Sequence, residues 1–75
     1  MTTTRERRTQ AERREGTITA LLDATVRCLA ERGYAATSTA AVCAEAGVSQ
    51  GALFRHFPTR QALLVATAEH VATRN

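Results

Sequence analysis

The chain has 75 residues, of which 44% are hydrophobic, so it can form one small domain and nothing larger. This length excludes a barrel, a doubly wound sheet and an enzyme with a deep cleft that excludes water. Fifteen residues are alanine and only one is proline, which favours an all-helical domain with a thin core.

The charge is uneven along the chain. All ten basic residues are arginines, against seven acids, which gives a net charge of +3. Residues 1–15 carry five arginines and three glutamates, and no acid occurs between Glu45 and Glu69. That second interval contains Arg55, His56 and Arg60. A first stretch with an excess of arginine and a second one without acids favour a polyanionic partner, although solvated helix faces also collect arginine.

No stretch resembles a membrane span or a secretory signal. A span needs about 20 consecutive apolar residues, and runs such as LLVA at 63–66 are far shorter. Two cysteines do not make a disulfide framework. We therefore expect a cytoplasmic protein without membrane contact.

The chain begins with a polar segment. Residues 1–9 lack apolar periodicity, so we expect a flexible basic arm. Apolar residues then recur every three or four positions, which predicts a helix over 10–32 that ends at Gly33. Gly16 weakens the first turns, since glycine costs about 1 kcal/mol relative to alanine. The inner stripe of this helix consists of Ile18, Leu21, Leu22, Thr25, Val26 and Leu29.

Three more helices are predicted, over 39–46, over 50–56 and from residue 60 to near the end, with Tyr34 packed over the junction before them. The hydroxyl groups that cap these helices come from Ser38, Ser49 and Thr59. Gly47 ends the second helix, and Pro58 stops the third. The inner side of the fourth helix consists of Leu63, Leu64, Thr67 and Val71.

The two short helices meet the requirements of a helix-turn-helix unit. Gly47 tolerates a left-handed conformation in the turn, and Cys43 is small where the two helices approach each other. Val48 supplies an apolar plug, and Leu53 and Phe57, spaced i and i+4, point into the core. The predicted fold is therefore all-α, a three-helix helix-turn-helix domain over 10–60 plus the start of a fourth helix.

If Leu53 faces inward, the other side of its helix is exposed. At about 100° per residue, Gly51 and Arg55 lie about 200° away from Leu53. The exposed face then holds Gln50, Gly51, Ala52, Phe54 and Arg55, without an acid. Glutamine can pair bidentately with adenine and arginine with guanine in the major groove, so this face suits double-stranded DNA.

The runs GYAATS at 33–38 and AGVSQGALFRHFPTRQAL at 46–63 resemble the DNA-binding domain of TetR-family transcriptional regulators. The likeness covers about residues 12–70. It implies that the third helix enters the major groove, that Thr39 meets a phosphate, and that Arg60 binds the DNA backbone where the family usually has lysine. The recognition-helix contacts that it implies come from Ser49, Gln50, Gly51, Ala52, Phe54, Arg55 and His56.

The resemblance also implies two partners, a small-molecule effector and a second copy of the protein. Both bind a further domain for which 75 residues leave no room. Family members continue into a helical domain that binds a small-molecule effector and forms a homodimer, which would read a palindromic operator as a repressor. We expect this chain to be the DNA-reading part of such a regulator, with residues 60–75 leading to the missing domain. Two departures from the family are Phe54, where tyrosine is common, and Leu29, where an aromatic residue is more usual.

Other interpretations of the same residues stay open. Arg55 and Gln50 can be plain solvated side chains, His56 a packed or capping histidine with one phosphate bond, and the arm an aid to solubility. His70 is expected at the surface or in a seam between helices. A helical protein-interaction module would use Phe54 and the apolar stripe of the fourth helix instead.

Metal and catalytic sites find little support. The four nominal zinc ligands are Cys28, Cys43, His56 and His70, and no two of them are close in sequence, so we expect no metal or cofactor. Cys43 is assigned to the packed side of its helix, which disfavours a nucleophile with His56 as its base. We expect a binding protein and not an enzyme.

Overall fold

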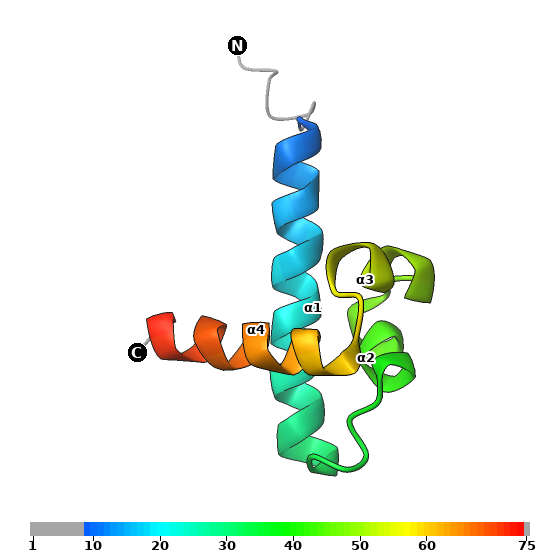
Figure 1. Cartoon of the computed structure of the whole chain (residues 1–75), viewed down its shortest axis with the longest axis vertical. Helices are drawn as coiled ribbons and strands as arrows, with labels where there is room; N and C mark the ends of the chain where they lie inside the picture. The colour runs from blue at the N-terminus through cyan, green and yellow to red at the C-terminus, as the bar shows by residue number, and fades with distance from the viewer. Residues whose placement is uncertain (1–8, 75) are drawn as a thin grey trace.

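The computed structural model describes residues 9–74, which form four α-helices and no strand (Figure 1). The helices are α1 (Gln10–Arg32), α2 (Thr39–Ala46), α3 (Gln50–His56) and α4 (Arg60–Arg74). The all-α fold class is thereby confirmed, and α1, α2 and α3 coincide with the ranges that the sequence predicts. Residues 1–8 of the expected arm lie outside the described part of the chain.

The start of α1 is held by a capping box. The Thr9 hydroxyl accepts a hydrogen bond from the Glu12 backbone N–H, and the Glu12 carboxylate accepts one from the Thr9 N–H, both at 3.1 Å. Two donors that no helical carbonyl can reach are thus satisfied. Thr9, assigned to the arm from sequence, is instead the cap of α1, and the helix continues through Gly16 without a break.

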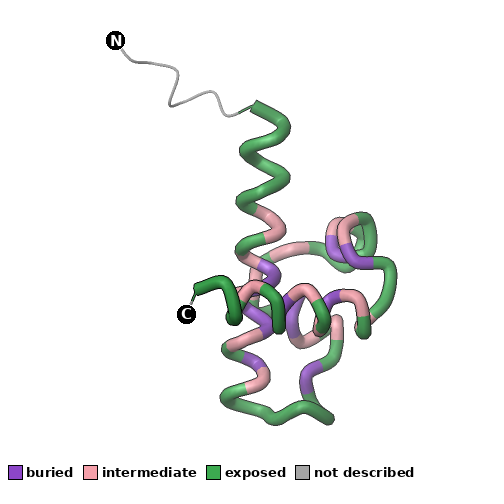
Figure 2. Tube along the Cα trace, turned by 60° about the vertical axis from the view of Figure 1, so that its left-hand side comes forward, coloured by how far each residue is buried: buried purple, intermediate pink, exposed green. Residues whose placement is uncertain are grey.

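The core lies where the second half of α1 meets α2 and α4, with α3 packed against α2. Figure 2 shows buried residues in this half of α1 and exposed ones in its first turns. The core side chains are Leu21, Leu22, Ala24, Cys28, Val42, Cys43, Leu53, Phe57 and Leu63. The stripe predicted for α1 omitted Ala24 and Cys28, because small side chains contribute little to an apolar pattern.

Helix α4 runs across α1 rather than along it (Figure 1). Leu63 and Thr67 are buried near the crossing, and the Thr67 hydroxyl donates to the Leu63 carbonyl at 2.8 Å. Val71 lines a hollow together with Asp23, Val26 and Arg27 of α1, so it lies on the predicted side of α4, but it is 40% exposed and not part of the core. A helix that crosses its neighbour can bury only the turns at the crossing.

The turn between α2 and α3 depends on Gly47, which has φ 71° and ψ 34° in the left-handed region. Its N–H and that of Val48 both donate to the Cys43 carbonyl, at 2.9 and 3.1 Å. This closes the end of α2 and turns the chain sharply into α3. Val48 packs partly buried against the core, as predicted.

Candidate nucleic-acid interface

Helix α3 is fixed from both ends and from one side. The Ser49 hydroxyl accepts from the Ala52 N–H at 3.1 Å, which makes Ser49 the N-cap. Leu53 is fully buried and Phe57 is buried at the C-terminal end, so this pair faces the core as predicted. The orientation of α3 about its own axis is set by these two side chains.

The opposite side of α3 is the recognition face, which consists of Gln50, Gly51, Ala52, Phe54 and Arg55. Ala52 is partly buried and the other four residues are exposed, with Phe54 43% exposed. None of the five is acidic, so the face offers one amide, one guanidinium and one aromatic ring on a backbone that Gly51 leaves uncovered. Such groups can read base edges and pack on sugars or thymine methyl groups.

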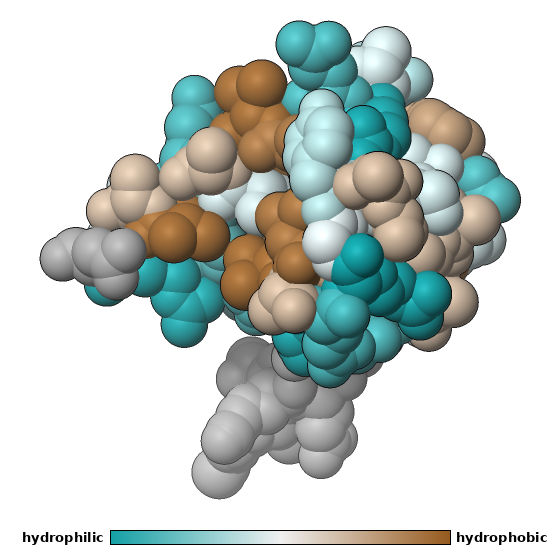
Figure 3. Space-filling model, turned by 90° about the horizontal axis from the view of Figure 1, so that it is seen from below, coloured by the Kyte–Doolittle hydropathy of each residue, from teal (hydrophilic) through white to brown (hydrophobic). Residues whose placement is uncertain are grey.

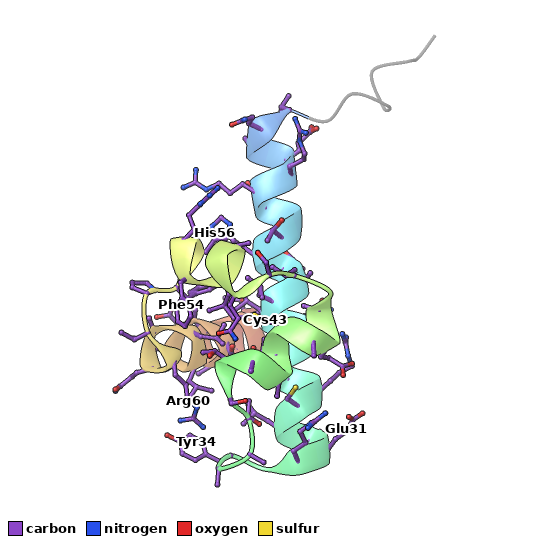
Figure 4. The ribbon with its side chains drawn as sticks, turned by 90° about the vertical axis from the view of Figure 1, so that its right-hand side faces the viewer. Glu31, Tyr34, Cys43, Phe54, His56 and Arg60 are labelled. Atoms are coloured by element: carbon purple, nitrogen blue, oxygen red, sulfur yellow. The ribbon has the colours of Figure 1, made fainter. Side chains whose placement is uncertain are left out.

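A groove of about 620 Å³ separates this part of α3 from the first turns of α1. From α3 it is lined by Ala52, Arg55 and His56. From α1 it is lined by Gln10, Ala11, Arg13, Arg14 and Thr17. We call these eight residues the basic groove; Figure 4 shows His56 on the side of α3 toward the first turns of α1. The sequence showed that Arg13 and Arg14 belong to a basic stretch, but their place beside α3 is a product of tertiary packing.

Arg60 bonds to carbonyl groups of the protein's own backbone. Its Nε donates to the Thr37 carbonyl at 2.8 Å and its Nη2 donates to the Tyr34 carbonyl at 2.6 Å. The guanidinium carbon also lies 4.6 Å from the centre of the Tyr34 ring, and Figure 4 shows the two side chains together. Arg60 therefore ties the start of α4 to the loop between α1 and α2, a role that the sequence did not indicate.

Tyr34 itself is 66% exposed, so the expectation that its ring packs over the junction is wrong. The loop presents its carbonyls to Arg60, and the tyrosine ring lies against the guanidinium at the surface. The junction is instead closed by Thr37, which is buried and donates its hydroxyl to the Gly33 carbonyl at 2.7 Å.

Thr39 lies at the other predicted contact point, the first residue of α2. It is partly buried and follows the cap residue Ser38, whose hydroxyl accepts from the Ala41 N–H at 3.0 Å. The N-terminus of α2 therefore has a satisfied cap, with free N–H groups of the kind that attract phosphate. Thr39 and the recognition face belong to different helices, and Thr39 does not line the basic groove.

Two acids of the helical body, Glu45 and Asp23, form ion pairs with residues outside α3. Glu45 accepts from Arg27 Nε at 2.8 Å, and this hydrogen bond raises the pKa of Arg27. Asp23 pairs with His70 at 2.9 Å and with Arg74 at 3.3 Å, which places His70 in the seam between α1 and α4, one of the two places expected for it. Glu31 is near the far end of α1 from His56 (Figure 4).

Both cysteines are free and buried. Burial raises the pKa of the Cys43 thiol, which keeps it in its unreactive protonated form. Among residues 9–74 no three His, Cys, Asp or Glu side chains gather as metal ligands would. Within the same residues, no helix has the length and hydropathy needed to cross a membrane.

Comparison with known proteins agrees with this geometry. The family model described as bacterial regulatory proteins, tetR family, matches residues 21–67. An uncharacterized HTH-type transcriptional regulator of Mycobacterium bovis is 49% identical over 67 residues, which is 89% of this chain and 34% of that protein. The HTH-type transcriptional regulator CymR of Pseudomonas putida is 50% identical over 64 residues, 85% of this chain and 32% of CymR.

A third relative, an HTH-type transcriptional repressor of Mycobacterium tuberculosis, is 40% identical over 69 residues, 92% of this chain and 37% of the repressor. No solved structure matches the chain. The chain thus spans about a third of the length of the curated relatives that it matches. With the family model matching the helix-turn-helix and its flanking helices, the chain belongs to the tetR family of bacterial regulatory proteins.

Proposed function

We propose that this chain binds double-stranded DNA sequence-specifically, as the DNA-reading part of a bacterial transcription regulator. The observation that carries the proposal is the division of α3 into two faces. Leu53 and Phe57 anchor one face in the core, and the recognition face is solvent-facing and free of acids. A helix about 10–12 Å across fits a major groove about 12 Å wide.

Each residue of the interface has a proposed role. Gln50 pairs with adenine and Arg55 with guanine, since both side chains can bond a base edge bidentately. Phe54 packs on a sugar or a thymine methyl group, and Gly51 lets the backbone approach the DNA. Ala52 lies beside these readers, and phosphate bonds come from Ser49, Thr39 and His56.

Arg60 has a double role in this proposal. Two of its nitrogens are bonded to loop carbonyls, so a phosphate contact would be made through Nη1. The same guanidinium would then hold the loop and the DNA backbone together, and its planar fork of five N–H donors suits this shared bonding.

The relatives continue well beyond the third of their length that this chain matches, and a regulator that contains this chain would have a corresponding further part. We propose that it supplies a homodimer interface and a small-molecule effector site, and that the dimer reads a palindromic operator in the cytoplasm. Half-sites about one helical turn apart would match its two-fold symmetry. The relative named a repressor supports repression as the outcome of binding. The proposed activity is binding alone, without catalysis.

Selection of bound sites from a random duplex library tests this proposal, with the chain fused to a short dimerising coiled coil. We expect a palindrome to be recovered. Changing Arg55 to Ala should cost about 1–3 kcal/mol and relax the preference at one base pair, as expected for a base contact. The matched control is Arg32→Ala, because Arg32 is the last residue of α1 and does not belong to the recognition face. This variant should bind DNA like the unchanged chain. Absence of DNA binding at low salt would sink the proposal, and equal loss on all sequences would make Arg55 a phosphate anchor.

A second candidate, a helical protein-interaction module, draws on the exposed apolar side chains Phe54, Val65 and Val71, which are 43%, 52% and 40% exposed. Figure 3 shows the strongly hydrophobic residues of one face in separate groups between hydrophilic ones. Such a broken distribution suits a large docking interface less well than a continuous patch does. The anisotropy of labelled duplex DNA at low salt separates the two, because an interaction module would leave it unchanged.

A further inference from the structure

The basic groove contains charges of one sign. Among the described residues that line it are three arginines, from both α1 and α3, the imidazole of His56, and no carboxylate. Like charges gathered on one concave surface repel one another, and an anion placed between them removes that repulsion. The groove therefore has the electrostatic character of an anion site.

The two acids in the described first turns of α1 lie off the groove side. Glu12 and Glu15 are close in sequence to Arg13 and Arg14, but at about 100° per residue they lie roughly 150° around α1 from the groove side. The carboxylate of Glu12 is in addition occupied by the backbone N–H of Thr9. Arg13 and Arg14 are each about 100° around α1 from the adjacent glutamate, so arginines and acids lie on different sides of the helix.

These arginines have no structural task among the described residues. Residues 10–16 are all exposed, so the first two turns of α1 bury nothing. Arg27 and Arg74 form ion pairs that join α1 to α2 and α4. By contrast, Arg13, Arg14 and Arg55 form no ion pair within residues 9–74. Their guanidiniums remain available to an external anion.

We propose that the basic groove seats the sugar-phosphate strand that borders the major groove entered by α3, with Arg13 and Arg14 neutralising its phosphates. This rests on the proposed function, because the groove shares Ala52 and Arg55 with the recognition face. A helix inserted in the major groove has a phosphate strand on either side, and the groove lies on the α1 side. The guanidinium suits phosphate because its N–H groups bond two oxygens at once. The first turns of α1 thus set the position of α3 on the duplex without reading bases.

The salt dependence of binding tests this role. Anisotropy of two labelled duplexes of unrelated sequence is measured from about 20 to about 200 mM salt, where counterion release dominates. The double variant Arg13→Gln/Arg14→Gln is compared with Arg32→Gln/Arg74→Gln, which removes the same charge from the far end of α1 and the end of α4. Circular dichroism melts of each variant establish that the helices are retained. The lysine variant Arg13→Lys/Arg14→Lys keeps the charge at the groove.

We expect the groove variant to make the negative slope of log affinity against log salt shallower by about 2, close to 0.9 for each phosphate that is no longer neutralised. The loss of affinity should be the same on both duplexes, the control should keep the slope of the unchanged chain, and the lysine variant should retain most of it. If the unchanged chain binds DNA and the groove variant matches the control, the groove role is overturned and the proposed function stands. A weaker affinity on one duplex alone also overturns it, since phosphates are common to every sequence. No binding by the unchanged chain overturns both.

Discussion

The two halves of α1 are one continuous helix held in place by different forces. Residues 10–16 are exposed and depend on the capping box and on intrinsic helix propensity. The second half buries Leu21, Ala24 and Cys28 almost completely. Only the second half of α1 therefore contributes side chains to the core. The first half needs no apolar side chains, so its positions can be occupied by arginines.

The largest effect should come from the packed half. Changing Leu21 to Ala removes a side chain with no exposed surface and should cost about 2–5 kcal/mol, through reduced burial and a cavity. A domain of this size has little stability in reserve, so the melting transition should move far down or disappear. Thermal and urea melts followed by circular dichroism measure it. The control is Gln10→Ala in the exposed half, and an equal loss of stability there would contradict the distinction between the halves.

The second effect concerns the turn that attaches α3 to the packed body. Gly47→Ala should cost about 1–2 kcal/mol, because a side chain is disfavoured in the left-handed region. No atom lies within 4 Å of the added Cβ, so backbone strain accounts for the whole cost. The urea midpoint should fall while the helicity of residues 10–16 is unchanged.

Gly51→Ala is the matched control for that substitution, because Gly51 lies in α3 with only the Ser49 hydroxyl, at 3.9 Å, near the added Cβ. It should raise stability by about 0.5–1 kcal/mol, since glycine inside a helix costs that much relative to alanine. A similar loss of stability in Gly51→Ala would mean that an added methyl group is costly here even without a left-handed φ, and the φ of Gly47 would no longer explain the cost there. If Gly51 allows close approach to DNA, the same variant should bind more weakly while folding more stably.

Some features of the fold could be predicted from the sequence, and others could not. Helix ends were predictable because Ser38, Ser49 and Gly47 act within a few residues of their own positions. The direction of α3 was predictable because Leu53 and Phe57 are one turn apart. The exposure of Val71 depends on the angle at which α4 crosses α1, and no local pattern records that angle.

The site divides in the same way. The recognition face followed from the periodicity of a single helix, whereas the basic groove requires two helices that are far apart in sequence. The bonds from Arg60 to the carbonyls of Tyr34 and Thr37 span more than twenty residues. An arginine that binds carbonyls and one that binds phosphate look alike in a sequence, so only the fold distinguishes them.

A third and smaller effect should be confined to the exposed half. Thr9→Ala removes the hydroxyl of the capping box and should cost about 1 kcal/mol of local helix stability. Because residues 10–16 bury nothing, the fraying should reduce their amide protection and the total helicity without shifting the melting midpoint. Hydrogen exchange resolved by residue measures it, with Ser38→Ala as the control, since that cap serves the packed body. A shift of the midpoint by Thr9→Ala would show that the two halves are coupled.

The smallest effect should appear with pH, and again only in the packed body. Burial raises the pKa of Cys43, so at alkaline pH the unfolded chain loses this proton while the folded chain keeps it. The free energy of unfolding should therefore fall as pH rises above about 8.5, the ordinary thiol value, and level off once the folded thiol ionises. Urea midpoints at about pH 7 and about pH 9.5, compared between the unchanged chain and Cys43→Ala, isolate this group from others that titrate nearby. The variant should lose less stability over that interval, because it has no thiol to ionise at this position. An equal fall in both would mean that the Cys43 thiol ionises as readily folded as unfolded, and that the packed body is open to water at α2.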